Sequence, residues 1–164
     1  MTADSDYPDI KFIVDHNVGK LTKLLRMLGY DAVFFNGESD SEMVAKALNE
    51  GRIILTRDTG ISARRAVTDG KVKIILLKTD NPALQIQEVV HELRLSERSK
   101  PFTRCLECNV PLEERTREEV EARVPPYVFK TQKHFMECPR CHRIYWKGTH
   151  WQAMERKLDN LKGN

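Results

Sequence analysis

The sequence has no long apolar segment. None of its apolar runs approaches the roughly 20 residues that a membrane-spanning helix needs. Residues 2–9 are polar and acidic, unlike the start of a secretory signal peptide. Internal repeats and low-complexity segments are also absent. We therefore expect a cytoplasmic protein that does not interact with membranes.

A strong charge of one sign is also missing, because the formal net charge of the 164 residues is only +3. Residues 1–98 carry 14 Lys+Arg against 15 Asp+Glu, whereas residues 99–164 carry 13 against 9. The C-terminal part is thus the more basic one. Charge by itself favours a nucleic-acid partner only weakly.

Cysteine is absent from the first 104 residues, and all four cysteines follow as Cys105-x-x-Cys108 and Cys138-x-x-Cys141. In an intracellular chain, two such pairs indicate zinc before disulfides. Four thiolates fill a tetrahedral site and leave no position for water, so we expect structural rather than catalytic zinc. The spacing of 29 residues between the pairs predicts a zinc ribbon with an insertion. A redox pair or an iron site is the alternative.

Four short runs rich in β-branched and aromatic residues predict parallel strands buried on both faces. They are Lys11–Val14, Ala32–Phe35, Arg52–Thr56 and Lys73–Leu77. Helical patterns alternate with them up to about residue 96, which predicts an α/β fold.

An acid follows each of these runs: Asp15, Asp40, Asp58 and Asp80. Because parallel strands end at one edge of the sheet, we expect the four carboxylates there, where α/β sheets bind ligands. They would repel one another unless cations lay between them. Mg²⁺ or Mn²⁺, which takes oxygen ligands, suits such a site. The pattern therefore favours a metal-dependent phosphodiesterase.

Helix capping offers a purely structural reading of the same acids. Ser39 and Glu42 have the spacing of a capping box with Asp40 between them. Asp58 is a suitable N-cap for a helix that we expect to run to Gly70. Capping explains Asp80 less well, since Asn81 can cap the next helix, and solvation of the Asp80 carboxylate is then the structural alternative.

Cationic side chains lie near the expected strand ends and in the cysteine-containing part, where they would either bind phosphate or be solvated. The first group is Lys20, Lys23, Arg57, Arg64 and Arg65, and the second is Lys130, Lys133, Arg140, Arg143 and Lys147. Trp146 and Trp151 accompany the second group and would either stack on unpaired bases or pack the ribbon against the sheet.

Several motifs in this order resemble the Mut7-C RNase domain family over residues 11–157. They are Phe12–Asp15, Leu24–Asp31, Ser39–Asp40, Gly51–Asp58, Arg104–Asn109, Val124–Tyr127 and Cys138–Trp151. The resemblance implies a PIN-like fold and a ribonuclease that requires Mg²⁺ or Mn²⁺.

The resemblance also implies roles for single residues. Asp15 and Asp58 match the two metal-binding acids that are most regular in PIN-like cores, and Asp40 matches the acid before the second helix. Glu42 is an alternative to Asp40, because many PIN domains use a glutamate within that helix. Asn17 would be an outer-shell contact, and the fourth acidic position, Asp80, is ambiguous.

We therefore expect a PIN-like nuclease domain over residues 10–98, a linker over 99–103 and a zinc ribbon over 104–157, with an inserted charged segment and a C-terminal helix. Within the insertion, Glu113–Glu121 is expected to be helical. The expected partners are RNA and a ribonucleoprotein particle. A non-catalytic RNA-binding or ribonucleoprotein-assembly module is the alternative, followed by a phosphoacceptor signalling domain.

Overall fold

The four apolar runs form one parallel sheet in the computed structural model, which describes residues 9–37, 39–95 and 99–162. The strands are β1 (Lys11–Asp15), β2 (Asp31–Phe35), β3 (Ile53–Thr56) and β4 (Ile74–Leu76). Their order is β2-β1-β3-β4, and every neighbouring pair is parallel. The predicted α/β fold with about four parallel strands is confirmed.

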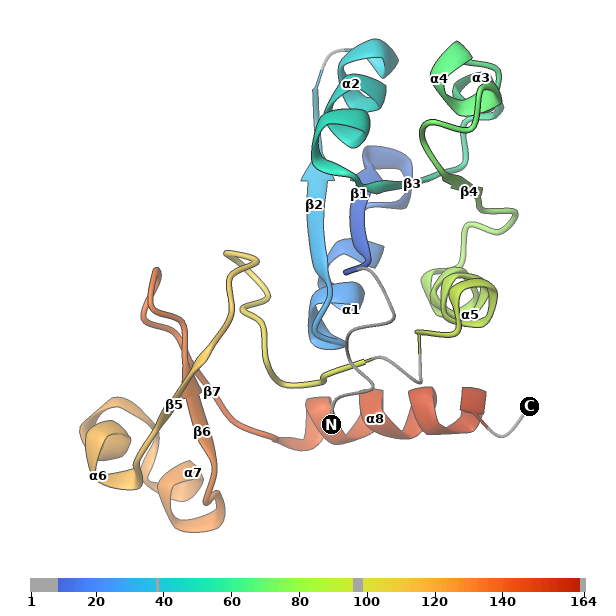
Figure 1. Ribbon diagram of the computed structural model, residues 1–164. Helices are drawn as coiled ribbons and strands as arrows, with labels where there is room; N and C mark the ends of the chain where they lie inside the picture. The colour runs from blue at the N-terminus through green and yellow to red at the C-terminus, as the bar shows by residue number, and fades with distance from the viewer. Residues whose placement is uncertain (1–8, 38, 96–98, 163–164) are drawn as a thin grey trace, which may run out of the picture.

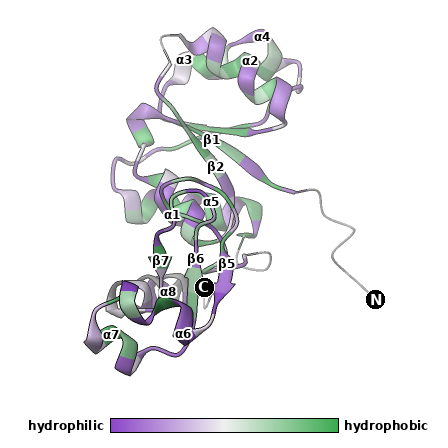
Figure 2. Ribbon diagram, turned by 90° about the vertical axis from the view of Figure 1, so that its left-hand side faces the viewer, coloured by the Kyte–Doolittle hydropathy of each residue, from purple (hydrophilic) through white to green (hydrophobic). Residues whose placement is uncertain are grey.

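Helices cover both faces of this sheet (Figure 1). One face packs against α1 (Leu21–Met27) and α5 (Pro82–Leu93), and the other against α2 (Asp40–Glu50), α3 (Thr59–Ser62) and α4 (Arg65–Thr68). Alternation along β1 explains the two cores, because Phe12 and Val14 lie in the first and Ile13 in the second. The strands are accordingly apolar between the two helical layers (Figure 2).

The strand order places a topological switch point between β1 and β3. The chain leaves β1 through α1 toward β2 on one side, and it leaves β3 through α3 and α4 toward β4 on the other. Connections that diverge in this way open a crevice at the carboxyl ends of the strands, where open α/β sheets bind their ligands. The end of β1 at Asp15 and the end of β3 at Thr56 border this crevice.

Local capping signals fix several helix ends. The Ser39 hydroxyl accepts from the Glu42 amide at 3.2 Å, and α2 ends at the left-handed Gly51 (φ 67°). Asn81 caps α5 as expected. The helix predicted from Asp58 to Gly70 is instead the two short helices α3 and α4, because Arg64 between them has extended backbone (φ −65°, ψ 144°).

A second, antiparallel sheet forms in the cysteine-containing part, in the order β5-β6-β7. The strands are β5 (Glu113–Arg115), β6 (Phe135–Glu137) and β7 (Ile144–Tyr145), and the helices are α6 (Arg117–Val120), α7 (Pro126–Thr131) and α8 (Thr149–Lys162). Short 3₁₀ turns cover His16–Val18 and Glu121–Arg123. Glu113–Glu121, expected to be helical, therefore begins with a strand that pairs with β6.

The segment between the two sheets packs against the end of α1. The Lys100 amide donates to the Leu28 carbonyl at 2.9 Å, and a Cβ at Gly29 would lie only 2.3 Å from the Lys100 carbonyl oxygen. Gly29 also has φ +93°, so both its backbone conformation and the lack of space for a side chain require glycine at this position. Within the linker expected at residues 99–103, the amides of Lys100 and Phe102 thus donate to the Leu28 and Met27 carbonyls at the end of α1. Across the described ranges, no helix combines the length and apolarity needed to cross a bilayer.

Candidate active site and metal centre

The hydroxyl of Thr56 joins two of the strand-end acids across the switch point. It donates to Asp15 Oδ2 at 2.7 Å and accepts from the Asp58 amide at 3.0 Å. Asp15 is only 4% exposed, and its Oδ1 accepts from the amide of His16 at 2.8 Å. The imidazole Nδ1 of His16 lies 3.0 Å from the same oxygen. Asp15 is therefore a buried carboxylate whose orientation is fixed from both sides.

Asp58 and Asn17 complete this part of the edge. Asp58 Oδ1 accepts from the Gly60 amide at 2.8 Å, so this residue is the N-cap that the sequence indicated. Asn17 Oδ1 accepts from the Arg57 amide at 3.3 Å, which links the loop after β1 to the loop after β3. Asn17 thus contacts backbone at the switch point, while the Arg57 side chain is exposed.

The remaining candidate acids lie apart from this pair. Asp40 lies in the first turn of α2, where Arg64 Nη2 is 3.9 Å from its carboxylate and Arg64 Nη1 donates to the Ser41 hydroxyl. Glu42 is exposed in the same turn, and Asp80 is exposed after β4. In the part of the chain that the structure describes, the four cysteines alone form a group of three or more potential metal ligands with converging atoms. The carboxylates are therefore spread along the edge rather than gathered in one tight cluster.

An open groove of about 740 Å³ begins beside Asp15 on the face covered by α1 and α5. Its walls come from the 3₁₀ turn after β1, the start of α1, the end of β2 and the start of α5. The lining residues are His16, Asn17, Val18, Gly19, Lys20, Thr22, Lys23, Arg26, Phe34, Asp80, Pro82 and Gln85. The predicted phosphate-binding residues Lys20 and Lys23 thus lie with Asp80 in one concave surface.

The four cysteines come together in the second part of the chain, where their sulfur atoms all lie within 4.8 Å of one another. Tetrahedral coordination with Zn–S bonds of about 2.3 Å puts the sulfurs roughly 3.8 Å apart. The Sγ atoms of Cys105 and Cys141 are separated by 3.8 Å. The donor set and its spacing fit a closed zinc site without an open coordination position.

Hydrogen bonds prepare one of these sulfurs for metal binding. Burial disfavours the thiolate of Cys105, but hydrogen bonds from the Tyr145 hydroxyl and from the amides of Cys108 and Glu107 outweigh it. The pKa of Cys105 falls from 9.0 to about 7. The Tyr145 oxygen lies 3.1 Å from the sulfur.

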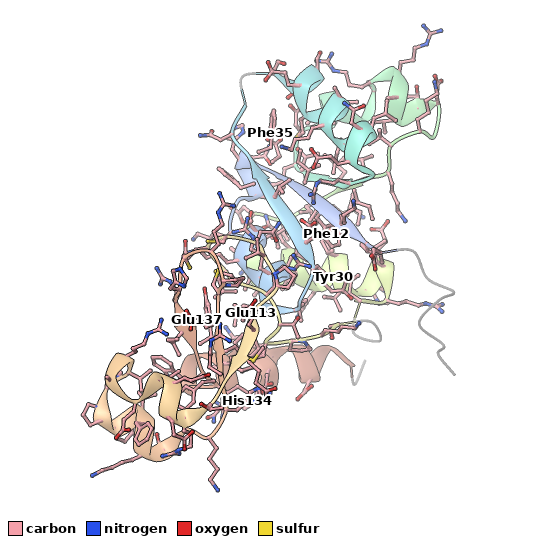
Figure 3. The ribbon with its side chains drawn as sticks, turned by 60° about the vertical axis from the view of Figure 1, so that its left-hand side comes forward. Phe12, Tyr30, Phe35, Glu113, His134 and Glu137 are labelled. Carbon is pink, nitrogen blue, oxygen red and sulfur yellow. The ribbon has the colours of Figure 1, made fainter. Side chains whose placement is uncertain are left out.

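Glu137, the residue before Cys138, is the centre of a group of ion pairs. Figure 3 shows it close to Glu113, its partner across the β5–β6 pair. Two like charges in this position would repel, but Arg115 bridges them, with Nη2 2.8 Å from Glu113 and Nε 3.0 Å from Glu137. Arg123 binds the same Glu137 oxygen at 2.9 Å. The hydrogen bond from Arg123 is the largest cause of the lowered pKa of Glu137, which is about 2.

The first cysteine pair is attached to the edge of the parallel sheet. Asn109 Oδ1 accepts from the Ala32 amide at 3.1 Å, and Arg26 Nε donates to the Ala32 carbonyl at 2.9 Å. Arg26 Nη1 also donates to the Leu106 carbonyl at 2.7 Å. Side chains thereby satisfy both outward backbone groups of Ala32 on edge strand β2. The ribbon is held against the parallel sheet by hydrogen bonds as well as by apolar packing.

The predicted RNA-binding residues of the ribbon differ in their surroundings. Lys130, Lys133, Arg140, Arg143 and Lys147 are exposed. Trp146 packs at the edge of the cluster around Phe135, whereas Trp151 is 8% exposed and packs edge-on against Phe102, with ring centroids 5.0 Å apart. Trp151 also contacts the cluster containing Met27 of α1, so it packs the ribbon against the α/β part.

Of the predicted phosphate-binding residues in the α/β part, Arg65 lies 4.0 Å from Asp69 on the surface.

Thr56 is a site residue that the sequence pattern did not single out. A hydroxyl inside a buried strand needs a hydrogen-bond partner, and its position two residues before Asp58 is the signal that could have identified it. Phe34 is an aromatic residue that is 47% exposed at the groove. The sequence pattern predicts only that it belongs to a strand.

Comparison with family models places most of the chain in one family. The model described as Mut7-C RNAse domain matches residues 10–158. No curated protein shows a significant match to the chain. No solved structure does either.

Proposed function

The chain belongs to the Mut7-C RNase domain family, which indicates a ribonuclease-type function. On that premise we propose that it hydrolyses RNA phosphodiester bonds with the help of Mg²⁺ or Mn²⁺ at the carboxyl edge of the parallel sheet. The observation that carries the proposal is the link from Asp15 through the Thr56 hydroxyl to Asp58 at the switch point. It connects the Asp15 carboxylate with the backbone of Asp58 at the place where α/β sheets bind ligands.

The donor set suits a hard divalent cation. Mg²⁺ is commonly held by one or two carboxylates and keeps several waters, so it does not need a tight cluster of acids. Asp15 and Asp58 would hold the ion, with Asp40 or Glu42 from α2 and Asp80 from the loop after β4 as additional acids and Asn17 in the outer shell. When bound, the ion would supply positive charge for the phosphate oxygens and activate a water for hydrolysis.

The residues of the chain would perform the remaining tasks. Thr56 and His16 hold the Asp15 carboxylate in one orientation, so that the site is formed before RNA arrives. Lys20, Lys23, Arg57, Arg64 and Arg65 would contact the phosphate backbone beside these acids. The exposed cations of the ribbon, together with Trp146, would extend the contact to RNA or to a ribonucleoprotein particle.

Zinc would have a structural role in this scheme. Four thiolates close its coordination sphere, and binding energy on the order of 10 kcal/mol would fold the small ribbon. The folded ribbon would then keep Asn109 and Leu106 bound to β2 and Arg26.

Cleavage of an end-labelled RNA of mixed sequence tests the proposal. Wild type, Asp15→Asn/Asp58→Asn and the surface control Asp69→Asn would be compared in metal-free buffer with Mn²⁺ or Mg²⁺ added back, after their zinc content has been measured. We expect metal-dependent cleavage by wild type and the control only, with 5′-phosphate and 3′-hydroxyl ends. Products with a 2′,3′-cyclic phosphate would contradict hydrolysis by water. RNA binding without cleavage under any metal would favour the non-catalytic RNA-binding module.

A further inference from the structure

The groove beside Asp15 contains an aromatic surface that the fold itself does not use. Phe34 lies on edge strand β2, on the same face as the fully buried Ala32, yet 47% of its surface is exposed. The backbone of Gly19 lies close to the ring, since a Cβ there would lie 2.9 Å from Phe34 Cε2. The ring packs against Gly19 and still presents a free surface to the groove.

A cation without an ion-pair partner lies in the same groove. Within the described ranges, Lys20 is exposed and forms no ion pair, whereas Lys23 Nζ lies 2.9 Å from Glu107 Oε1 of the first cysteine pair. That Lys23–Glu107 pair is solvent-exposed, with 60% and 44% of the side chains accessible, so it is weak and exchangeable. The buried hydroxyl of Thr22 is also in the wall and has no hydrogen-bond partner among the described residues.

An aromatic ring beside a free cation matches the chemistry of an unpaired nucleotide. A base can stack on the ring while the neighbouring phosphate pairs with the cation. The volume of about 740 Å³ lies within the range of small-molecule sites. A base inside a duplex has both faces covered by its neighbours and cannot stack on Phe34.

We infer that this groove is a nucleotide subsite in which one unpaired base of the RNA stacks on Phe34 and an adjacent phosphate pairs with Lys20. Because His16 and Asn17 line the groove and His16 contacts Asp15, the bound nucleotide lies beside the proposed cleavage site. Glu107 competes with phosphate for Lys23, so it weakens RNA binding. The inference rests on the proposed RNA substrate, but it concerns binding and not cleavage.

Fluorescence anisotropy of the zinc-loaded full chain in buffer without Mg²⁺ or Mn²⁺ tests the subsite separately from catalysis. The probe is a fluorescein-labelled oligouridylate, with a labelled RNA duplex of the same length for comparison. We expect Phe34→Leu to weaken single-strand binding about five- to 100-fold with an unchanged salt dependence. Phe34→Tyr, which keeps the ring, should bind like wild type. Leu48→Ala on α2 is the matched control, because Leu48 is equally exposed but lies on the opposite face.

The charged residues give effects of opposite sign. Log K for RNA binding falls as log salt rises, and Lys20→Met should make this slope less steep by about 0.7. Glu107→Gln should instead tighten binding. Unchanged affinity in Phe34→Leu, or equal losses in Phe34→Leu and Leu48→Ala, would overturn the subsite even if wild type cleaves RNA. Absence of single-strand binding by wild type at low salt would also overturn it. Phe34-dependent binding without cleavage in Mn²⁺ would support the subsite and refute the nuclease.

Discussion

The amide of Asn109 donates to the carboxylate of Asp31 at 2.7 Å, joining the first cysteine pair to the edge strand of the parallel sheet. The other side-chain atom of the amide accepts from the Ala32 backbone. Asn109 has φ +63°, a conformation that asparagine tolerates better than most residues. The backbone of Asn109 thus forms the turn, and its side chain attaches the ribbon to the parallel sheet.

Removing this attachment should destabilise the whole chain. Asn109→Ala leaves the Ala32 amide without its partner and should lower the free energy of unfolding by about 1–3 kcal/mol. Asn109→Gly relieves the backbone strain while losing the same hydrogen bonds, so the difference between the two variants isolates the strain. Urea denaturation of the zinc-loaded proteins measures both values. Wild-type stability in Asn109→Ala, which gains no relief of backbone strain, would show that the side-chain bonds contribute little.

Thr56 should matter for both stability and cleavage. Thr56→Val keeps the shape of the side chain but leaves Asp15 Oδ2 and the Asp58 amide unpaired, so we expect a loss of about 1–3 kcal/mol. Cleavage should fall by at least about tenfold, since a misplaced catalytic group is costly. Thr56→Ser retains the hydroxyl and should retain most activity. Equal activity of the valine and serine variants would show that Asp15 does not need this contact.

Zinc should bind with a stoichiometry of one ion per chain, and its removal should unfold the ribbon. Cys141→Ser removes one ligand and should lower zinc occupancy, measured by mass spectrometry of the metal content. Because Trp151 packs between the ribbon and α1, its fluorescence should change when zinc is lost. Ser62→Ala, an exposed hydroxyl outside the ribbon, serves as the control. Full zinc content in Cys141→Ser would mean that this cysteine is not a ligand.

The Asp31 carboxylate should make stability depend on pH in the acid range. Partial burial acts to raise its pKa, but hydrogen bonds from Arg52 and Asn109 outweigh burial and lower the pKa below the ordinary value of 3.8. A lowered pKa contributes stability above the pKa of the unfolded chain, and this contribution is lost as the pH falls through the folded value. Asp31→Asn should therefore be less stable than wild type at pH 7, and this difference should shrink as the pH falls below 3.8 and vanish below the folded pKa of Asp31.

Denaturation of both proteins at each pH measures this difference, and loss of zinc in acid affects both alike. Asp69→Asn, which removes only a surface partner of Arg65, should behave like wild type throughout. A stability gap for Asp31→Asn that persists unchanged in acid would contradict the assignment.

Much of the fold could be predicted because its signals are local. The four apolar runs became the strands β1 to β4, and Ser39, Gly51 and Asn81 mark helix ends through bonds to neighbouring residues. The two Cys-x-x-Cys pairs are also local signals, and they predicted that the four cysteines form one metal site. By contrast, the helix after Asp58 was predicted as one element, because the extended conformation of Arg64 is not visible in the apolar spacing.

The sequence by itself determined which residues form strands and which acids follow them, since hydrophobic periodicity and caps act over a few residues. Only the tertiary structure decided which acids are neighbours. The order β2-β1-β3-β4 places Asp15 beside Thr56 and Asp58, while Asp40 and Asp80 lie apart from this pair. Strand pairing and the docking of Asn109, Arg26 and Trp151 join residues far apart along the chain. Their geometry depends on how whole surfaces pack together, which no local pattern encodes.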